Sequence, residues 1–574
     1  MDKNQETGGH NGNRSEVGIA DRVGGDRGAR NVGAVDRRRN RDAMGGERAD
    51  YPDTKLLTGA VLSPMSQDRR YDLIAIASCL FVGILGLWVG ASREVGNWGV
   101  EADFFSRDVE QTSRILAGEP YTNRHYPPGY AYLLALSSRF TSDLFVAGKI
   151  LTSLSAVLFG VVTYRLLSSL WGKRLALAAT LLVLLTLVPY TFLASVDMPA
   201  NLALVLSMWL LLRRETSLGL CLQAGLAAGA AYLLRYNALF LLAGIPLVLL
   251  TAGDPAEPWR SRLTKVGWFL GAALVVMAPW LLVNWYRNGS PFASDLYQQV
   301  AARFYHPQKD AFVWATDEMG KKFNSVWEVL VYDPWRFTKM FLKDVVYGKA
   351  HRLAWRVLEF PSILFAGAGL LLYVHHLNRR RAAFLILCLA GYLLHGLAGF
   401  AVRFYFFLFP LLFLAVVLPV FQWERLPLPW SGGRVEWAAG WWIFGILALA
   451  SGYHAYVSTT WLLQTQPTYL MEAATEVRSR AVAGDRMMAI EPHLSYLSKL
   501  PFRSGAVANS LDRYVEIVAA EGIRFLVYSK HEEEYWPGLR VLSQPDHMPK
   551  SLQVIYEHKP SSTIIYEVVR SGPE

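Results

Sequence analysis

Three aspartates stand beside long apolar segments, where a carboxylate could take a proton from a reacting hydroxyl group. Asp103 and Asp108 lie in the polar stretch 100–136, and Asp197 lies in the sequence Ser-Val-Asp-Met-Pro at 195–199. A carboxylate within reach of a hydroxyl can act as a general base. Aspartate is also favoured at the start of a helix, where its side chain caps backbone N–H groups. The residues alone leave catalysis and capping open for both Asp103 and Asp197.

Two arginines have the chemistry to complement an anionic group. Arg235 ends an Ala- and Leu-rich segment, and Arg403 opens another apolar segment. The planar guanidinium donates two parallel hydrogen bonds to a phosphate. An arginine at a membrane boundary also extends its charged end into water without binding a ligand. Both interpretations stand for each arginine.

A third group of candidates precedes a pair of prolines. Arg124, His125 and Tyr126 lead into the sequence Pro-Pro-Gly at 127–129, after which an apolar pattern resumes. His125 is equally consistent with a surface histidine or with a ring packed on Tyr126. No cluster of His, Cys, Asp or Glu has the spacing of a metal site, so no metal ligands are predicted.

The stretch 100–136 must present these side chains from the loop after the first apolar segment. Read as an α-helix, it carries acidic and basic residues three or four positions apart on one face. Those residues are Asp103, Arg107, Glu110 and Arg114. A mostly apolar stripe forms another face, as in a helix lying along a membrane surface. Asp108 is well off the face of Asp103 in such a helix, so the two should not point into one site. Asp108 is therefore only the fallback candidate.

The composition is that of a membrane protein. The chain has 574 residues, 52% of them hydrophobic, and a mean hydropathy of +0.21. Apolar runs of roughly 20 residues recur, the length that crosses a hydrocarbon core of ~30 Å. The net charge of +10 falls mostly in loops and in an Arg-rich tail. It therefore indicates membrane orientation and contact with anionic lipid, not nucleic-acid binding. All three cysteines fall in predicted spans, which argues against disulfides.

The predicted fold class is an all-α polytopic membrane protein with a small C-terminal α/β domain. Residues 1–70 are predicted to be a disordered cytoplasmic tail, because they lack large apolar side chains. The transmembrane module covers 71–461 and includes a first external loop at 93–143 and a large external loop at 287–357. About eleven spans are predicted, at 72–91, 144–170, 174–193, 198–213, 217–234, 238–252, 265–285, 358–377, 382–401, 404–421 and 437–459.

Residues 462–574 return to the composition of a soluble domain. Strands are predicted at 485–490 and 522–528, with a helix at 511–520 between them. A final strand pair is predicted at 554–556 and 563–569. No glycine-rich phosphate-binding loop follows a strand.

Basic loop residues set the predicted orientation in the cell membrane. Lysine and arginine pairs or triplets fall on alternate loops, at 173–174, 213–214, 260–265 and 379–381. Cytoplasmic loops are enriched in such residues. The loop with Asp103, the turns with Asp197 and Arg235 and the C-terminal domain are then extracytoplasmic, and the N-terminus is cytoplasmic.

The first external loop resembles that of the GT-C glycosyltransferases, in the branch of protein O-mannosyltransferases and lipid A aminoarabinose transferases. The resemblance rests on a carboxylate after the first span, Gly118 about fifteen residues later, and the run Tyr-Pro-Pro-Gly-Tyr from Tyr126. It implies a GT-C fold and an extracytoplasmic transfer of a sugar from a polyprenyl-phosphate donor. Asp103 takes the position of the catalytic aspartate. Phe104 replaces the glutamate that usually follows, and Tyr126 replaces a basic residue.

The resemblance implies roles for the other candidates as well. Asp197 matches an aspartate that faces the family's site, and Arg235 stands where the family often has a lysine. Arg403 resembles an arginine in a late Arg-Tyr…Pro element. Arg124, His125 and Tyr126 are then expected to contact substrate. Some relatives bind a divalent metal near this loop, so the cofactor requirement stays open.

The resemblance competes with two other functions. A transporter or lipid flippase is also polytopic, but it commonly shows inverted repeats and charged residues at mid-membrane. No such repeat is evident, and the acids gather in external loops. A transferase of the O-antigen-ligase type would use the late loop 287–357. The predicted acceptor of the favoured enzyme is a glycolipid, a glycan or a protein.

Overall fold

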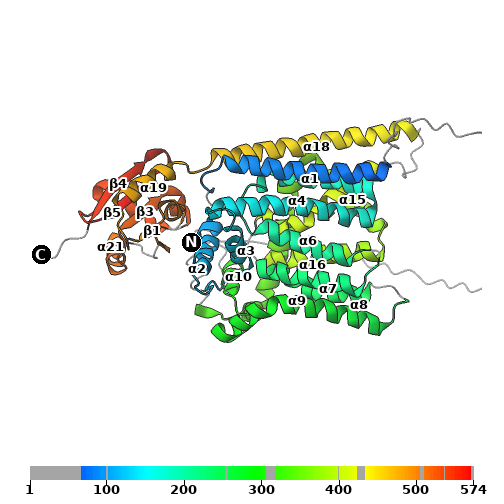
Figure 1. Ribbon diagram of the computed structural model, residues 1–574, viewed down its shortest axis with the longest axis horizontal. Coiled ribbons are helices and arrows are strands. Elements are labelled where there is room, and N and C mark those ends of the chain that lie inside the picture. Colours follow the sequence, from blue (N-terminus) through cyan, green and yellow to red (C-terminus); the bar gives the residue numbers. More distant parts are fainter. Residues whose placement is uncertain are drawn as a thin grey trace, which may run out of the picture. The chain divides into compact units, whose positions relative to one another are not determined.

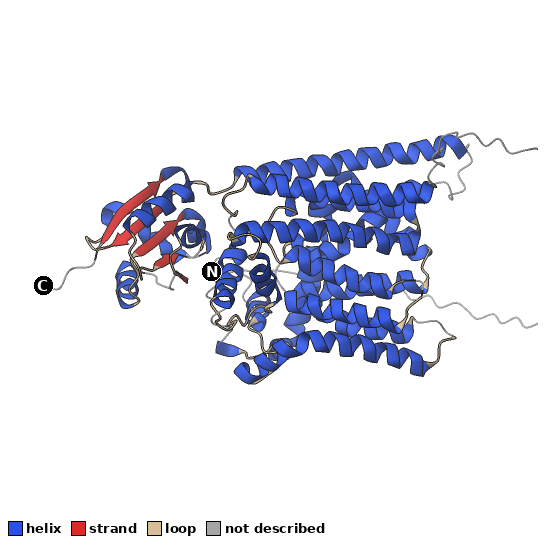
Figure 2. Cartoon of the chain, viewed as in Figure 1, coloured by secondary structure: helices blue, strands red, loops and turns tan. Residues whose placement is uncertain are grey.

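The computed structural model describes residues 66–569, except 98–100, 214, 253–255, 306–318, 320, 398–399, 423–432, 490–491, 505–509 and 536. The predicted disordered tail lies almost entirely outside these residues. The described chain forms a helical bundle followed by a small domain that contains a sheet (Figures 1 and 2).

The bundle has a helix at each predicted span. These helices are α1 (Gln67–Ala91), α4 (Leu144–Trp171), α5 (Lys173–Leu187), α6 (Asp197–Leu211), α7 (Leu218–Leu234), α8 (Leu239–Thr251), α9 (Trp259–Asn288), α15 (Glu359–His375), α16 (Arg379–Leu397), α17 (Phe409–Gln422) and α18 (Gly433–Gln464). Seven helical segments of the described chain are long and apolar enough to cross a membrane, and three shorter apolar helices accompany them. The predicted fold class is therefore confirmed, whereas the count of eleven spans stays a prediction.

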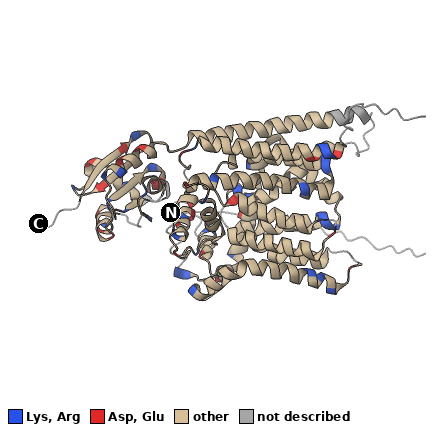
Figure 3. Cartoon of the chain, in the orientation of Figure 1, with Lys and Arg blue, Asp and Glu red and all other residues tan. Residues whose placement is uncertain are grey.

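Charge follows the same division between helix and loop. The helix middles are mostly uncharged, and the charged residues of the bundle gather near helix ends and loops (Figure 3). A helix satisfies its backbone groups internally, so only its side chains need to match the hydrocarbon. This is why apolar runs become bundle helices and the polar stretches between them become loops.

Two external loops are themselves helical. The first contains η1 (Phe104–Val109), α2 (Glu110–Leu116) and α3 (Gly129–Ser137). The large loop contains α10 (Leu296–Tyr305), α12 (Val326–Tyr332), α13 (Pro334–Phe341), η5 (Leu342–Lys349), α14 (Ala350–Leu353) and η6 (Ala354–Leu358). Short 3₁₀ turns close three junctions: η2 (Val188–Tyr190), η3 (Tyr236–Ala238) and η7 (Val402–Leu408).

The C-terminal domain has a five-stranded sheet in the order β2-β1-β3-β5-β4. The strands are β1 (Met487–Ala489), β2 (Phe502–Ser504), β3 (Phe525–Ser529), β4 (Leu552–His558) and β5 (Thr563–Val568), and the longer helices are α19 (Tyr469–Arg480), α20 (His493–Ser498), α21 (Leu511–Ala520) and α22 (Lys530–Tyr535). β3 is parallel to β1 and antiparallel to β5. Alternate residues of β3 enter two apolar clusters, because side chains of a strand point to opposite faces.

Glycines set the closest helix contact of the bundle's α7–α9 pair. A Cβ atom on Gly225 would lie 2.2 Å from the carbonyl oxygen of Phe269, and one on Gly229 would lie 2.7 Å from that of Ala273. Gly225 and Gly229 are one turn apart, so the backbones approach along one stripe. Small residues at this spacing allow close helix packing in a membrane.

We predict that Gly225→Leu forces α7 away from α9 and lowers the melting temperature of the detergent-purified protein. Overpacking a helix interface costs about 1–3 kcal/mol. Gly271→Leu on α9 is the control, because no atom lies within 4 Å of the position of its Cβ. Equal melting temperatures for the two variants would contradict the proposed contact.

Candidate active site

The central feature of the site is a buried carboxylate between two guanidinium groups. The side chain of Asp197 is 3% exposed, at the first residue of α6. Its Oδ1 lies 2.5 Å from Nη2 of Arg235, and its Oδ2 lies 2.8 Å from Nε of Arg403. The hydroxyl of Ser195 donates to Oδ2 at 2.7 Å. A buried charge is tolerated when it is paired in this way. The side chain of Asp197 makes no capping bond within the described chain.

The two arginines reach Asp197 because two helix junctions meet the start of α6. Arg235 is the extended residue that ends α7, and Arg403 lies in the 3₁₀ turn η7. Asn201, one turn into α6, accepts a bond from the N–H of Phe407 at 2.9 Å and donates to the carbonyl of Arg403 at 3.2 Å. This amide fixes η7 against α6 and thereby places Arg403.

Asp103 faces the same arginines from the first external loop. Its carboxylate lies 3.9 Å from Nη2 of Arg403, and its side chain is 49% exposed. It makes no capping bond in the described residues, although it stands at the start of η1. The surrounding protein raises the pKa of Asp103 by desolvation, but the nearby Arg107, Arg403 and Arg235 outweigh this effect and leave its pKa lowered. Asp103 is therefore an ionised carboxylate whose exposed side opens into a recess.

The recess is lined by residues of η1, of the segment before α6 and of both arginine junctions. They are Asp103, Phe104, Arg107, Asp108, Ala194, Ser195, Val196, Asp197, Arg235 and Arg403. The structure thus brings together four predicted residues: both proposed catalytic aspartates and both arginines.

Asp108 also lines this recess, contrary to the geometry predicted for an α-helix. The segment from Phe104 to Val109 is a π-helix, which has more residues per turn than an α-helix. Residues five positions apart therefore lie nearer to the same face of the helix than they would in an α-helix. Asp103 and Asp108 accordingly line the same recess. Asp108 binds Arg107 through both of its oxygens, at 2.6 and 2.7 Å. Burial raises the pKa of Asp108, and Arg107 offsets only part of this shift.

The three residues before the proline pair have different surroundings. The ring of Tyr126 lies 3.9 Å from Cζ of Arg107, and its phenol bonds Gln299 of α10. The side chain of Asn123 fixes the turn by accepting the N–H groups of His125 and Tyr126 at 2.9 and 3.0 Å. His125 is half-buried, and this burial lowers its pKa.

Tyr126 therefore contacts Arg107, one of the residues that line the recess. Arg124, His125 and Tyr126 do not line the recess themselves, and their substrate contacts stay predictions.

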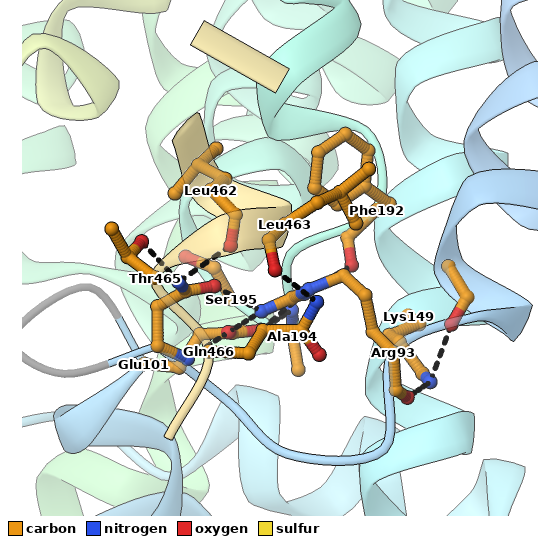
Figure 4. A network of polar contacts seen from close by, with 12 residues as sticks. Arg93, Glu101, Lys149, Phe192, Ala194, Ser195, Leu462, Leu463, Thr465 and Gln466 are labelled. Carbon is orange, nitrogen blue, oxygen red and sulfur yellow. Dashed lines mark hydrogen bonds and ion pairs between the residues drawn. The ribbon is translucent and has the colours of Figure 1, made fainter. Parts of the chain in front are cut away.

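A second buried network ties the two aspartate segments together (Figure 4). Glu101 forms a fully buried ion pair with Arg93, which follows α1. Glu101 also accepts the N–H of Ala194 at 2.7 Å, and Arg93 donates to the carbonyl of Phe192 at 2.9 Å. Glu101 precedes Asp103 by two residues, and Ala194 precedes Asp197 by three. The network therefore fixes the spacing of the two carboxylates.

The same network fixes the end of the first bundle helix. The buried ammonium group of Lys149, on α4, donates to the carbonyls of Gly90 and Arg93 at 2.7 and 2.8 Å. Gly90 lies in the last turn of α1, and Arg93 follows the helix, so Lys149 ties the end of α1 and the start of the next loop to α4. Asn97 extends the network to α18 by donating to the carbonyl of Leu462 at 2.7 Å.

The sequence analysis did not single out Arg93, Glu101 or the role of Arg107. All three are charged residues of the first external loop, and their types gave no sign that they are buried. The only hint in the sequence was that these residues of opposite charge lie close to apolar segments. In the described part of the chain, no group of three or more His, Cys, Asp or Glu side chains is arranged to hold a metal ion.

Solved structures with a similar arrangement belong to membrane glycosyltransferases. ArnT from Cupriavidus metallidurans, bound to undecaprenyl phosphate, matches with a TM-score of 0.52 and 13% identity over 88% of this chain and 99% of its own. The apo form of ArnT matches with a TM-score of 0.54 and 15% identity, over 89% of this chain and 100% of its own. A third match is the oligosaccharyltransferase AglB from Archaeoglobus fulgidus, in complex with an inhibitory peptide and a dolichol-phosphate. Its TM-score is 0.52 and its identity 13%, over 86% of this chain and 75% of its own.

Sequence comparison identifies one family segment. Residues 125–283 match the family dolichyl-phosphate-mannose-protein mannosyltransferase. This segment includes Asp197 and Arg235, whereas Asp103 and Arg403 lie outside it. Curated protein sequences give no match. The shared fold and the matched segment confirm the predicted resemblance to the GT-C glycosyltransferases.

We predict that Glu101→Gln strongly destabilises the protein, because it leaves Arg93 buried without its counter-ion. Breaking such a pair costs about 3–5 kcal/mol. The double variant Arg93→Met/Glu101→Leu removes both charges and should recover part of that loss. The measurement is thermal unfolding in detergent. A Glu101→Gln protein that melts like the wild type would show that the pair does not hold the two loops.

Proposed function

We propose that the protein is a membrane glycosyltransferase that moves a sugar from a polyprenyl-phosphate donor to a hydroxyl-bearing acceptor outside the cytoplasm. The proposal rests on one observation, namely that an aspartate and two arginines face each other in one recess. An accessible, ionised Asp103 stands opposite Arg235 and Arg403, which are anchored on Asp197. Transfer of a sugar from a phosphate needs these two features, a base and an anion site.

Asp103 is proposed as the general base. The acceptor oxygen attacks the anomeric carbon and gives its proton to Asp103 as the bond between that carbon and the phosphate oxygen breaks. A carboxylate of lowered pKa is a weak base, so it takes the proton late, when the attacking oxygen has become acidic. Direct displacement by one oxygen inverts the configuration at the anomeric carbon.

Arg235 and Arg403 are proposed to bind the phosphate. The two guanidinium groups carry one positive charge more than the carboxylate of Asp197 that they share, and the proposed base Asp103 lies 3.9 Å from Arg403. The leaving lipid phosphate gains negative charge as the sugar departs, and preorganised donors stabilise such charge. Asp197 then acts by orienting the two arginines.

An apolar groove beside the site suits the lipid portion of the donor. It lies among α3, α7 and α9, has a volume of about 580 Å³, and includes Pro128, Gly129, Leu233 and Leu234. In the chain, Pro128 and Gly129 lie two and three residues after Tyr126, and Leu233 and Leu234 are the two residues before Arg235. A lipid in the groove would thus place its phosphate near Arg235. The bound undecaprenyl phosphate of ArnT and the dolichol-phosphate of AglB support a donor of this class.

We predict that Asp103→Asn lowers sugar transfer by ~10²–10⁴-fold, because the amide cannot take the proton. The assay measures transfer from polyprenyl-phosphate sugars by detergent-purified protein. Glu110→Gln, on the exposed side of the same loop, is the matched control and should keep its activity. If Asp103→Asn stays active and Asp108→Asn is inactive, the base is Asp108. Near-normal activity in both variants would exclude a catalytic carboxylate in this loop.

The proposed orientation places the recess outside the cytoplasm and has its own test. Eleven crossings put the N-terminal tail and the C-terminal domain on opposite sides of the membrane. A reporter fused at Gly45 should therefore be located in the cytoplasm, and a reporter fused at Ser510 should be located outside it. Two cytoplasmic reports would contradict both the span count and the extracytoplasmic site.

A further inference from the structure

We propose that the Arg107–Asp108 pair binds a hydroxyl group of the transferred sugar and selects the donor by that contact. The proposal rests on the proposed function and assigns the sugar subsite of the same recess. The class of ligand is a neutral polyol ring, held beside the phosphate site of Arg235 and Arg403.

Arg107, which lines the recess, has an unused hydrogen-bond donor. Its side chain is 8% exposed, and its Nε and Nη2 donate to the two carboxylate oxygens of Asp108. Its Nη1 is buried and has no hydrogen-bond partner among the described residues. Buried donors are normally satisfied, so a buried unpaired N–H calls for a partner that arrives with the substrate.

The guanidinium of Arg107 cannot turn to satisfy Nη1 elsewhere. One face is covered by the ring of Tyr126, at 3.9 Å from Cζ. The two bonds to Asp108 fix its plane, and the hydroxyl of Thr112 donates to the backbone carbonyl of Asp108 at 2.6 Å. Because Arg107 and Asp108 are adjacent in the π-helix η1, their pairing is built into the loop that carries Asp103.

The charges divide the recess into two parts. Arg235 and Arg403 carry one positive charge more than the carboxylate of Asp197 that they share, and this charge lies beside the proposed base Asp103 and suits a phosphate. Arg107 and Asp108 neutralise each other, so they offer no net attraction to an anion. A neutral pair with a free N–H and with further lone pairs on its carboxylate complements a hydroxyl, which both accepts and donates. The phosphate therefore belongs to the first pair, and a sugar hydroxyl to the second.

The test compares lipids with and without the sugar. The probes are sugar-free undecaprenyl phosphate, a panel of undecaprenyl-phosphoryl hexoses and pentoses, and single-deoxy forms of the donor that binds best. The variant Arg107→Met/Asp108→Leu removes both charges together, so no unpaired charge stays buried. Arg107→Gln/Asp108→Asn is a second, more polar variant in case the first does not fold. Arg114→Met/Glu119→Leu removes another acid–base pair of the same loop, outside the recess, and is the matched control.

The expected result is a loss confined to the sugar. The variant should bind sugar-free undecaprenyl phosphate within about twofold of the wild type, but should bind the best donor roughly 10-fold more weakly. For one of the deoxy donors, the missing hydroxyl should weaken binding to the wild type and to the control protein. It should not weaken binding to the Arg107→Met/Asp108→Leu variant, because this variant already lacks the side chains that contact that hydroxyl.

Two other results would overturn the proposal in distinguishable ways. An equal loss for the sugar-free lipid and for the donor would make Arg107 a phosphate ligand, and would leave the proposed function intact. If removing the donor hydroxyl weakens binding to the variant as much as to the wild type, the Arg107–Asp108 pair does not contact that hydroxyl, and the proposal is wrong. A wild-type protein that binds none of the polyprenyl lipids would instead contradict the proposed function itself.

Discussion

The ionic contact of Asp197 with Arg235 and Arg403 is the constraint on which the site depends. A carboxylate with 3% exposure is stable only if it is paired, and both arginines come from the ends of other helices. The contact therefore requires the start of α6, the end of α7 and the turn η7 to meet at one point. The bundle packs α6 against both α7 and η7, and Asn201 completes the junction. Helix packing and the anion site are one structural feature.

The first external loop contributes the complementary part. The Arg93–Glu101 pair and the bond from Ala194 fix this loop against the segment before α6. The π-helix then turns Asp103 and Asp108 into one recess. The wider turn of the π-helix has changed which side chains line the recess. Irregular helices of this kind recur at functional sites, because they reposition side chains without breaking the helix.

The sequence predicted most of the bundle and part of the site. Apolar runs of bilayer length have few alternatives to helix, so the predicted spans match helices closely. The strands β3 and β5 and the helix α21 also followed from their patterns. Asp197, Arg235 and Arg403 could be chosen because each lies at the boundary of an apolar segment, and Asp103 because its spacing from Gly118 resembles that of the GT-C loop. Asp108 was misplaced, because the predicted face assumed 3.6 residues per turn and the chain there forms a π-helix. Arg93 and Glu101 could not be identified, since nothing in a charged residue's type shows that its partner is buried beside it.

Lys149 has a consequence for the depth of the reaction. By donating to the carbonyl of Gly90, in the last turn of α1, and to that of Arg93, just after the helix, it ties this end of α1 to α4. The loop that begins at Arg93 therefore starts at one height relative to the bundle. The phosphate of a membrane lipid is held at the interface by its own hydrocarbon chain, so it can explore little vertical space. If Asp103 is the base, as proposed, a base at a fixed height and a phosphate confined to a plane meet without a search along the membrane normal, and Lys149 helps to set the level at which they meet.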